Sequence, residues 1–241
     1  MKFVDIHTHI LYGVDDGAST LEQSLAILEV AKKYDVYGIC FTPHCFITNK
    51  LNIQEIKQKT EKIKLQSKSD INIFYGGEMM IENTLPTFMK ENSDFCLGEG
   101  KYVLIELPMF NYPIYIKEVL FQLKANGFIP IIAHPERNAS IQLETMKYIK
   151  DILTNGYLQI NGGSLTGKYG RLAKKTALKL IDNDLVSFVA SDSHDDKGYK
   201  LLDKAYDIYV KLKGKEKADE VFFYNPYRAL KGEYIEQVEM V

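Results

Sequence analysis

The stretch FVDIHTH, residues 3–9, joins a short apolar segment to two histidines that are one residue apart. In an extended segment, residues i and i+2 point to the same side, so His7 and His9 can bind one metal ion together. The aspartate pair Asp15-Asp16 follows, just before Gly17; a turn is the ordinary explanation for such a pair. The segment therefore predicts a strand whose carboxyl end carries the first half of a metal site.

Further segments of the same apolar kind recur along the chain. Seven are predicted to be strands: 3–6, 36–42, 73–75, 102–106, 128–133, 157–160 and 185–190. Continuous apolar runs of this length suit parallel strands that are covered on both faces. Segments with helical spacing alternate with them, and no linker rich in Pro, Gly or Ser interrupts the series. The pattern predicts a single α/β domain over residues 1–241, with a parallel sheet or barrel.

Helical spacing is clearest in segments 21–31, 53–63, 119–123 and 172–182. Ser19, with Glu22 three residues later, is predicted to cap the first of these helices. Segment 203–239 is expected to pack on the barrel, and a subunit contact there is left open. The lysine-rich stretch 50–68 is predicted to be a solvated helix face, with contact to acidic or phosphorylated tails as the alternative.

Composition narrows the functional classes. The formal net charge of −2 argues against nucleic-acid binding through general electrostatics. Three cysteines without a repeated spacing do not indicate a disulfide framework. No apolar run approaches the roughly 20 residues that cross a bilayer, and the first residues lack the features of a signal peptide. The protein is therefore expected to be cytoplasmic, without membrane insertion.

Metal-ligating side chains follow the predicted strands. They are His7, His9, His44, His134 and His194, together with Glu78 and Glu106. In α/β barrels the active site is built at the carboxyl ends of the strands, by residues from several of them. A single histidine at a strand end is more often a surface residue or a hydrogen-bonded core residue. The recurrence of the pattern at all five histidines favours a metal site.

The carboxylates and one arginine refine this prediction. Imidazoles with carboxylates suit Zn²⁺, Mn²⁺ or Fe²⁺. Glu78, Glu106, Asp16 and Asp192 supply more carboxylates than one tetrahedral ion needs, so at least two ions bridged by a carboxylate are expected. Arg137 lies three residues beyond His134. It is suited to bind a phosphate or carboxylate of a substrate, although a surface salt bridge is an equal alternative.

These motifs also carry a family resemblance. The set DIHTHI, VDDG, TPH, GGEM, IEL, AHPER and SDSH, in order from Met1 to His194, resembles the PHP (polymerase and histidinol phosphatase) superfamily. Within it, the chain is similar to bacterial manganese-dependent protein tyrosine phosphatases of capsule and exopolysaccharide operons. The resemblance implies a distorted TIM-like (β/α)7 barrel of the PHP type that holds three divalent ions. Mn²⁺ is expected, with Fe, Zn, Mg or Co as alternatives.

The resemblance further implies roles for individual residues. It assigns His7, His9, Glu78 and Asp192 to the first ion, Glu78, Glu106 and His134 to the second, and Asp16, His44 and His194 to the third. Arg137, Asp192 and His44 are the residues expected to act in catalysis, Arg137 by contacting the phosphoryl group. Relatives often carry a second arginine after the SDSH motif, where this chain has Lys197 and Lys200. A lysine is a point charge and does not replace a bidentate arginine.

The predicted activity is hydrolysis of phosphotyrosine by a metal-bound hydroxide. The resemblance implies that the substrate is the tail of an autophosphorylated tyrosine kinase that controls capsule or exopolysaccharide synthesis. Histidinol phosphatase, or another small-molecule phosphomonoesterase of the superfamily, is the alternative. The general acid, the native metal and the oligomeric state are left open.

Three other classes fit less well. A cysteine phosphatase needs an arginine six positions after its thiolate, but Phe46, Leu51 and Tyr102 occupy those positions after Cys40, Cys45 and Cys96. Of the three thiols, Cys45 is the one with a conceivable reactive role. An amidohydrolase shares the paired histidines but would use a bridging lysine, for which the chain offers no obvious candidate. A module that binds a phosphorylated tail without cleaving it would lack part of the ligand set.

Overall fold

The computed structural model describes residues 3–48 and 52–236. Within these ranges the strands are β1 Phe3–Thr8, β2 Val36–Phe41, β3 His44–Cys45, β4 Asn72–Tyr75, β5 Glu78–Met80, β6 Tyr102–Glu106, β7 Ile129–Ala133, β8 Tyr157–Asn161 and β9 Phe188–Ala190. They form two sheets, of order β1-β2-β4 and β3-β5-β6-β7-β8-β9. Each pairing between these strands is parallel. The fold is therefore α/β with parallel sheets, as predicted.

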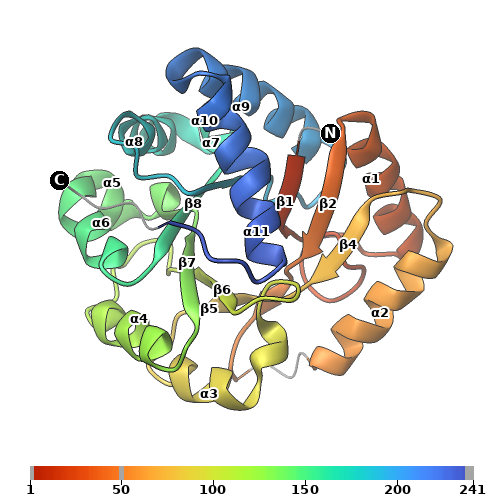
Figure 1. Ribbon diagram of the computed structural model, residues 1–241, viewed down its shortest axis with the longest axis horizontal. Helices are drawn as coiled ribbons and strands as arrows, with labels where there is room; N and C mark the ends of the chain where they lie inside the picture. Colours follow the sequence, from red (N-terminus) through yellow and green to blue (C-terminus); the bar gives the residue numbers. More distant parts are fainter. Residues whose placement is uncertain (1–2, 49–51, 237–241) are drawn as a thin grey trace.

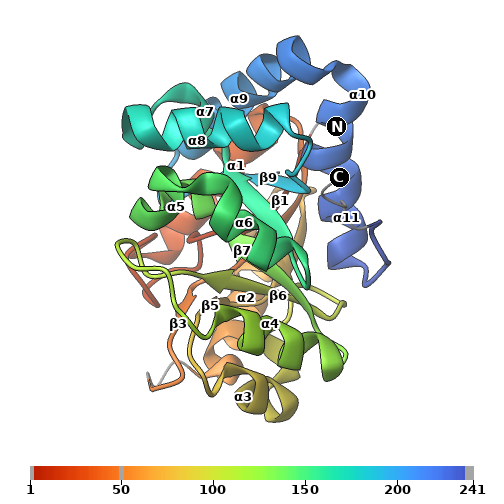
Figure 2. The same cartoon turned by 90° about the vertical axis from the view of Figure 1, so that its left-hand side faces the viewer.

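The helices lie outside the strands (Figure 1). They are α1 Leu21–Lys33, α2 Ile53–Gln66, α3 Leu85–Glu91, α4 Ile116–Ala125, α5 Ala139–Leu143, α6 Thr145–Leu153, α7 Gly162–Thr166, α8 Gly170–Asp182, α9 Gly198–Lys213, α10 Lys215–Asp219 and α11 Asn225–Leu230, with the short 3₁₀ helices η1 Ser93–Phe95 and η2 Pro135–Arg137 and the π-helix η3 Glu220–Tyr224. Helices α7 to α10 gather at one end of the molecule and α3 lies at the other (Figure 2). No helix among the described residues is both long enough and apolar enough to cross a membrane.

All seven predicted strands are present; the strand at 102–106 has the predicted ends, and the other six differ by one to three residues at one end. The sequence did not indicate β3 and β5, which have only two and three residues. Segments this short carry no readable periodicity. They are nevertheless important, because β3 begins at His44 and β5 begins at Glu78.

The first helix begins at Leu21, where its apolar spacing predicts it, but its cap lies one residue later than predicted. Its cap is Thr20 rather than Ser19, and the Thr20 side chain accepts a hydrogen bond from the backbone N–H of Gln23. The Gln23 side chain in turn accepts a hydrogen bond of 2.7 Å from the backbone N–H of Ser19. Both hydrogen bonds are typical of a helix N-terminus. The pattern therefore located the helix correctly but placed its cap one residue too early.

Backbone hydrogen bonds also join the edges of the two sheets. The Asp192 N–H donates to the carbonyl of His7 at 3.0 Å, and the His9 N–H donates to the carbonyl of Ser193 at 2.9 Å. Within the larger sheet, the Glu78 N–H donates to the carbonyl of Pro43 at 3.0 Å, next to the pairing of β3 with β5. The segment after β9 is thereby held against the carboxyl end of β1.

The late segment packs against the opposite ends of the strands. The Tyr102 hydroxyl, at the start of β6, donates to the carbonyl of Glu233, and the Tyr157 hydroxyl, at the start of β8, donates to Ile235. Leu230 and Ile235 are buried among strand side chains. The predicted packing of segment 203–239 is confirmed against the strands up to residue 236, and residues 237–239 lie outside the described residues. Residues 50 and 51 of the predicted lysine-rich stretch 50–68 also lie outside them.

Candidate metal centre

The predicted ligands gather at the carboxyl ends of the strands. His7 lies within β1 and His9 follows directly after its end, Glu106 ends β6, and His134 follows β7. The structure brings three overlapping groups of ligand atoms within 4.8 Å of one another: His7, His9 and Glu78; His44, Glu78 and Glu106; and His9, Asp16, His44 and His194. These groups contain seven of the nine predicted ligands, and the other two, His134 and Asp192, contact them.

Glu78 lies at the centre of the cluster and is fully buried. Its Oε1 atom is 2.9 Å from His134 Nε2 and 3.3 Å from His7 Nε2. Its Oε2 atom is 2.8 Å from His44 Nδ1 and 3.4 Å from His9 Nε2. One carboxylate therefore faces four imidazoles, which is the arrangement expected of a bridging ligand.

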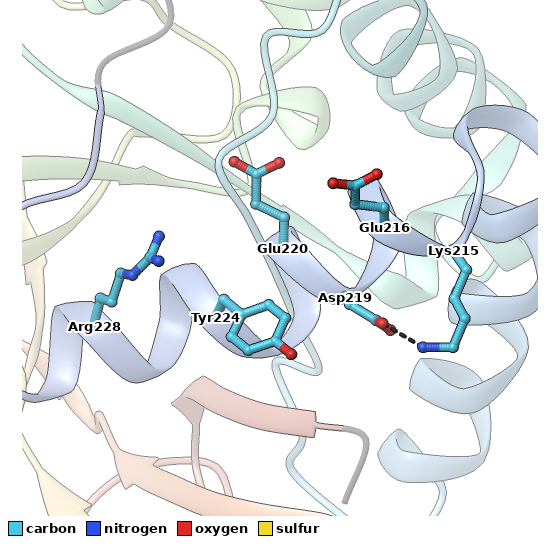
Figure 3. Close-up of a pocket in the computed structure, with 6 residues that line it drawn as sticks. All are labelled: Lys215, Glu216, Asp219, Glu220, Tyr224 and Arg228. Carbon is cyan, nitrogen blue, oxygen red and sulfur yellow. Dashed lines mark hydrogen bonds and ion pairs between the residues drawn. The ribbon is translucent and has the colours of Figure 1, made fainter.

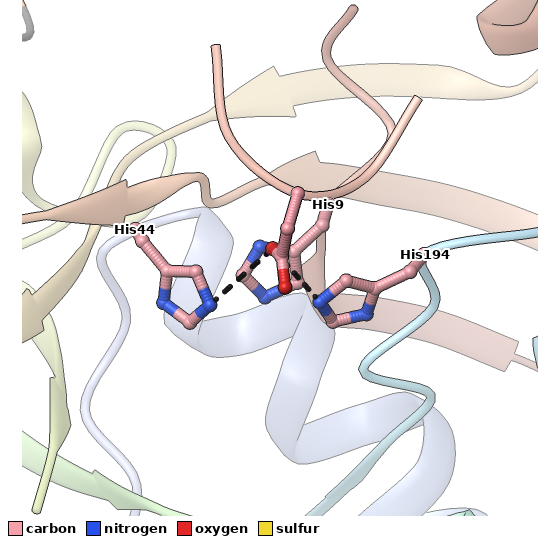
Figure 4. A group of neighbouring side chains, drawn as sticks. His9, His44 and His194 are labelled. Atoms are coloured by element: carbon pink, nitrogen blue, oxygen red, sulfur yellow. Dashed lines mark ion pairs between the residues drawn. The ribbon is translucent and has the colours of Figure 1, made fainter. Parts of the chain in front are cut away.

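Glu106 and Asp16 extend the cluster on two sides. Glu106 lies 3.5 Å from His44 Nδ1 and 4.0 Å from His134 Nε2. The Asp16 carboxylate lies 3.3 Å from His194 Nε2 and 3.6 Å from His44 Nε2. Figure 4 shows His9, His44 and His194 close together, and Asp16 belongs to the same group of ligand atoms. Asp16 is 69% exposed, so this side of the cluster is open to solvent.

Asp192 connects the cluster to Arg137. Its Oδ1 atom lies 3.3 Å from His9 Nε2 and 3.6 Å from His7 Nε2. Its Oδ2 atom accepts a hydrogen bond of 2.7 Å from Arg137 Nη1. Arg137 is 21% exposed, and its guanidinium carbon lies 4.3 Å above the ring of Tyr169. The salt bridge considered for Arg137 is thus present, but its partner is a buried carboxylate of the cluster rather than a group on the surface.

The charges of these groups are strongly coupled. Burial disfavours ionisation of Glu78, but the neighbouring histidines, His7 foremost, outweigh it and hold the pKa of Glu78 well below its usual range. For His7, burial favours the neutral ring, while Glu78 and Asp192 raise its pKa to about 9. Burial and the Glu78 charge raise the pKa of Glu106. The site therefore favours positive charge, which divalent ions would supply when bound.

Among the ligand atoms of the cluster, two buried atoms have no hydrogen-bond partner in the described part of the chain: His44 Nδ1 and Glu78 Oε2. They lie 2.8 Å apart, but their mutual orientation does not satisfy either of them. Leaving a buried polar atom without a partner costs about 1–3 kcal/mol. A cation held between an imidazole nitrogen and a carboxylate oxygen would satisfy both, so the donor set fits a metal centre.

Residues behind the cluster fix the orientation of His7. Gln159 Nε2 donates to Asn161 Oδ1 at 2.9 Å, which turns Gln159 Oε1 toward His7 Nδ1 at 2.8 Å. His7 Nδ1 then donates its proton to Gln159, so Nε2 is the nitrogen that faces the cluster and is available to a metal ion. Asn161 Nδ2 in turn donates to Asp192 Oδ2 at 2.7 Å. The sequence did not indicate Gln159 or Asn161, although both lie at the carboxyl end of a predicted strand.

Asp15 orients His9 in the same way. Its Oδ2 atom lies 2.7 Å from His9 Nδ1, and the Asp15 carboxylate also accepts from the backbone N–H groups of His44 and Gly17. A Cβ at Gly17 would lie 1.8 Å from the His9 carbonyl oxygen, so only glycine lets this loop approach β1. A turn is therefore not the full explanation for the two aspartates. Asp15 orients the His9 ring, and Asp16 faces the rings of His44 and His194.

Two cluster residues have unusual backbone conformations. His134 and Asp192 have φ values of 31° and 50°, in the left-handed region. Non-glycine residues adopt this region at a cost of about 1–3 kcal/mol, and they do so mostly at functional sites. The strain is offset by the contacts of both side chains within the cluster.

Other features of the chain lie apart from this centre. A hollow of about 710 Å³ is lined by Lys215, Glu216, Asp219, Glu220, Tyr224 and Arg228 (Figure 3). Acidic and basic side chains both line this hollow, and none of the cluster residues is among them. The thiol of Cys45 is buried and donates to the carbonyl of Pro43, and burial raises its pKa. These features argue against the reactive role considered for Cys45.

Comparison with known proteins places the chain in a family. The sequence profile described as "Capsular polysaccharide synthesis, CpsB/CapC" matches residues 3–231. The chain belongs to the CpsB/CapC family. Its relatives include the tyrosine-protein phosphatase CpsB of Streptococcus agalactiae, which is 33% identical over 248 residues, covering 96% of this chain and 100% of that protein. The tyrosine-protein phosphatase YwqE of Bacillus subtilis is 31% identical over 197 residues, covering 80% and 77%.

Solved structures agree with this membership of the CpsB/CapC family. One of them comes from work on YwqE of Bacillus subtilis and CpsB of Streptococcus pneumoniae, which are described as unique metal-dependent tyrosine phosphatases. It is 26% identical to this chain, has a TM-score of 0.85, and the match covers 98% of this chain and 97% of the other. The histidinol phosphate phosphatase of Lactococcus lactis, 16% identical with a TM-score of 0.56 and coverage of 85% and 94%, shares the fold.

The contact between Gln159 and His7 gives a first prediction for this member of the CpsB/CapC family. Gln159→Leu removes the acceptor that fixes the protonated nitrogen of His7, so we expect metal affinity to fall about 10- to 100-fold. Titration calorimetry with Mn²⁺ measures the change, and the exposed Gln66→Leu serves as the control. Equal affinity of the two variants would contradict an orienting role for Gln159.

Proposed function

We propose that this chain is a metal-dependent protein tyrosine phosphatase whose active site is the cluster centred on Glu78. The observation that carries the proposal is the convergence of five histidines and four carboxylates beside Arg137, in a chain of the CpsB/CapC family. Relatives named tyrosine-protein phosphatases and the structural match to metal-dependent tyrosine phosphatases support the same activity.

The nine predicted ligands would hold up to three divalent ions, with Mn²⁺ as the proposed metal. Glu78 is positioned to be shared between ions, because four imidazoles face its two oxygens. When bound, such ions polarise phosphoryl oxygens and lower the pKa of water.

The residues of the chain would orient the substrate and support the cluster. Arg137 uses one N–H group on Asp192, and a guanidinium has five such donors, so others remain for a phosphoryl oxygen. Gln159 and Asp15 hold His7 and His9 in fixed orientations. A tyrosine phenolate has a pKa of about 10 and therefore leaves with less protonation than an alkoxide. This makes phosphotyrosine the easier phosphomonoester for a site without an evident general acid.

Several finer points belong to the same proposal. Residues 1–241 would form one catalytic domain, and the two sheets would be the halves of a distorted (β/α)7 barrel of the PHP type. The hydrogen bonds that join β1 to residues 192 and 193 support that closure.

The substrate would be the phosphorylated tail of a tyrosine kinase that regulates capsule or exopolysaccharide synthesis. Assembly of the phosphatase into an oligomer is consistent with this role.

A comparison of substrates tests the proposed activity. With Mn²⁺ supplied, we expect hydrolysis of phosphotyrosine peptides, and excess EDTA should abolish it. The decisive quantity is kcat/KM for a phosphotyrosine peptide relative to histidinol phosphate. A preference for histidinol phosphate of tenfold or more, about 1.4 kcal/mol, would assign the chain to small-molecule hydrolysis instead.

A further inference from the structure

A groove of about 670 Å³ lies between the α7–α8 turn and helix α9. Its lining residues are Thr166, Gly167, Lys168, Lys174, Leu201, Lys204, Asp207, Ile208 and Lys211. Helices α7, α8 and α9 lie together at the top of the molecule in Figure 2. The family resemblance and the metal cluster assign no role to this groove.

The charge of the groove is strongly positive. Four lysines line it, Lys168, Lys174, Lys204 and Lys211, against one carboxylate, Asp207. None of the four forms an ion pair with another described residue. By contrast, Lys213, at the end of the same helix, pairs with Asp184 at 2.9 Å. Like charges gathered without partners repel one another, and an anionic ligand would relieve this repulsion.

Apolar side chains lie among these charges. On α9, residues 201, 204, 208 and 211 share one face, because they are spaced by three and four positions. Leu201 and Ile208 are half-buried, while Lys204 and Lys211 are exposed. Lys168 and Lys174 come from the other side of the groove. A concave surface with cations on both sides and apolar groups on α9 suits an extended peptide better than a flat membrane.

Lys168, which lines the groove, lies near Tyr169, and Tyr169 contacts the metal cluster. Lys168 Nζ lies 4.9 Å from the centre of the Tyr169 ring, and the Arg137 guanidinium lies 4.3 Å from the same ring. The Tyr169 hydroxyl lies 3.3 Å from Asp192 Oδ2. A peptide whose phosphotyrosine reaches Arg137 could therefore extend past Tyr169 and Lys168 into the groove.

We propose that the groove between the α7–α8 turn and α9 binds an acidic segment of the protein substrate next to its phosphotyrosine. The inference rests on the proposed phosphatase function and adds to it a preference for substrates with Asp or Glu beside the modified tyrosine. Lysines at such a surface act mainly through electrostatic attraction, so the preference weakens as salt is raised.

The test uses charge reversal in the full-length protein. The double variant Lys204→Glu/Lys211→Glu should raise KM for a phosphotyrosine peptide with four flanking glutamates by about tenfold or more at low ionic strength. The kcat for that peptide, and all constants for para-nitrophenyl phosphate, should stay within about twofold, since neither lysine touches the cluster. Lys90→Glu, an exposed reversal on α3 at the other end of the molecule, is the matched control.

A binding measurement separates this proposal from the phosphatase activity. Fluorescence anisotropy with a labelled glutamate-rich peptide that lacks phosphotyrosine requires no catalysis, and the double variant should weaken this binding about tenfold. Equal binding by the wild type, the double variant and Lys90→Glu would overturn the groove proposal. The proposal would also be overturned if the double variant lost binding to phosphatidylserine vesicles while its constants for the peptide stayed unchanged. The groove would then be a membrane contact. A wild type that binds this peptide but hydrolyses no phosphotyrosine would overturn the proposed function alone.

Discussion

Replacing Glu78 with glutamine is expected to lower kcat for para-nitrophenyl phosphate at least about 10³-fold, since a bridging ligand contributes several kcal/mol of charge stabilisation. Four imidazole nitrogens lie between 2.8 and 3.4 Å from the two Glu78 oxygens. Glutamine keeps the size of the side chain but removes its negative charge. Its amide nitrogen also cannot act as a ligand, so one side of the bridge is lost.

The same substitution should lower the number of bound ions. Metal analysis of the purified variant is expected to show less metal per chain than the wild type, with little change in the circular dichroism spectrum. Glu91→Gln, an exposed substitution at the end of α3, controls for loss of a carboxylate elsewhere. Full metal content together with activity within tenfold of the wild type would show that Glu78 does not hold the ions together.

The sequence predicted that the five histidines, Glu78 and Glu106 would lie close together because each of them follows a short apolar run. A histidine after a short apolar run can be read from FVDIHTH or PIIAH without knowledge of the fold. The same reading found Glu106, which ends β6. It placed Glu78 after the predicted strand at 73–75, which is β4. It did not indicate that Glu78 also begins the three-residue strand β5. The structure places these residues together because the strands are parallel and their carboxyl ends meet at one edge.

The supporting residues could not be predicted in this way. Gln159 and Asn161 act through a chain of side-chain hydrogen bonds that crosses from β8 to β1 and to Asp192. Such pairings depend on which strands become neighbours, and no local periodicity encodes them. The pairing of Arg137 with Asp192, 55 residues apart, has the same origin. Sequence patterns thus indicate which residue types converge, whereas the partner that orients each ligand depends on tertiary contacts.

Arg137→Lys is expected to lower kcat/KM for para-nitrophenyl phosphate about 10²- to 10³-fold, as the loss of one preorganised donor does in other enzymes. Arg137 is held from two sides, by Asp192 Oδ2 at 2.7 Å and by the ring of Tyr169. The guanidinium can keep the Asp192 contact and still present other N–H groups to a phosphoryl oxygen. A lysine ammonium lacks the planar fork, so it would serve one partner at the expense of the other.

Inorganic phosphate provides a readout that a purely structural role would not change. We expect the inhibition constant for phosphate to rise at least about tenfold in Arg137→Lys, while metal content stays close to that of the wild type because the nine proposed ligands are intact. Tyr169→Phe keeps the ring beneath the guanidinium and should retain most of the affinity for phosphate, since the aromatic face supplies the stacking contact. An unchanged inhibition constant in Arg137→Lys, with reduced turnover, would instead mean that the arginine acts only by holding Asp192.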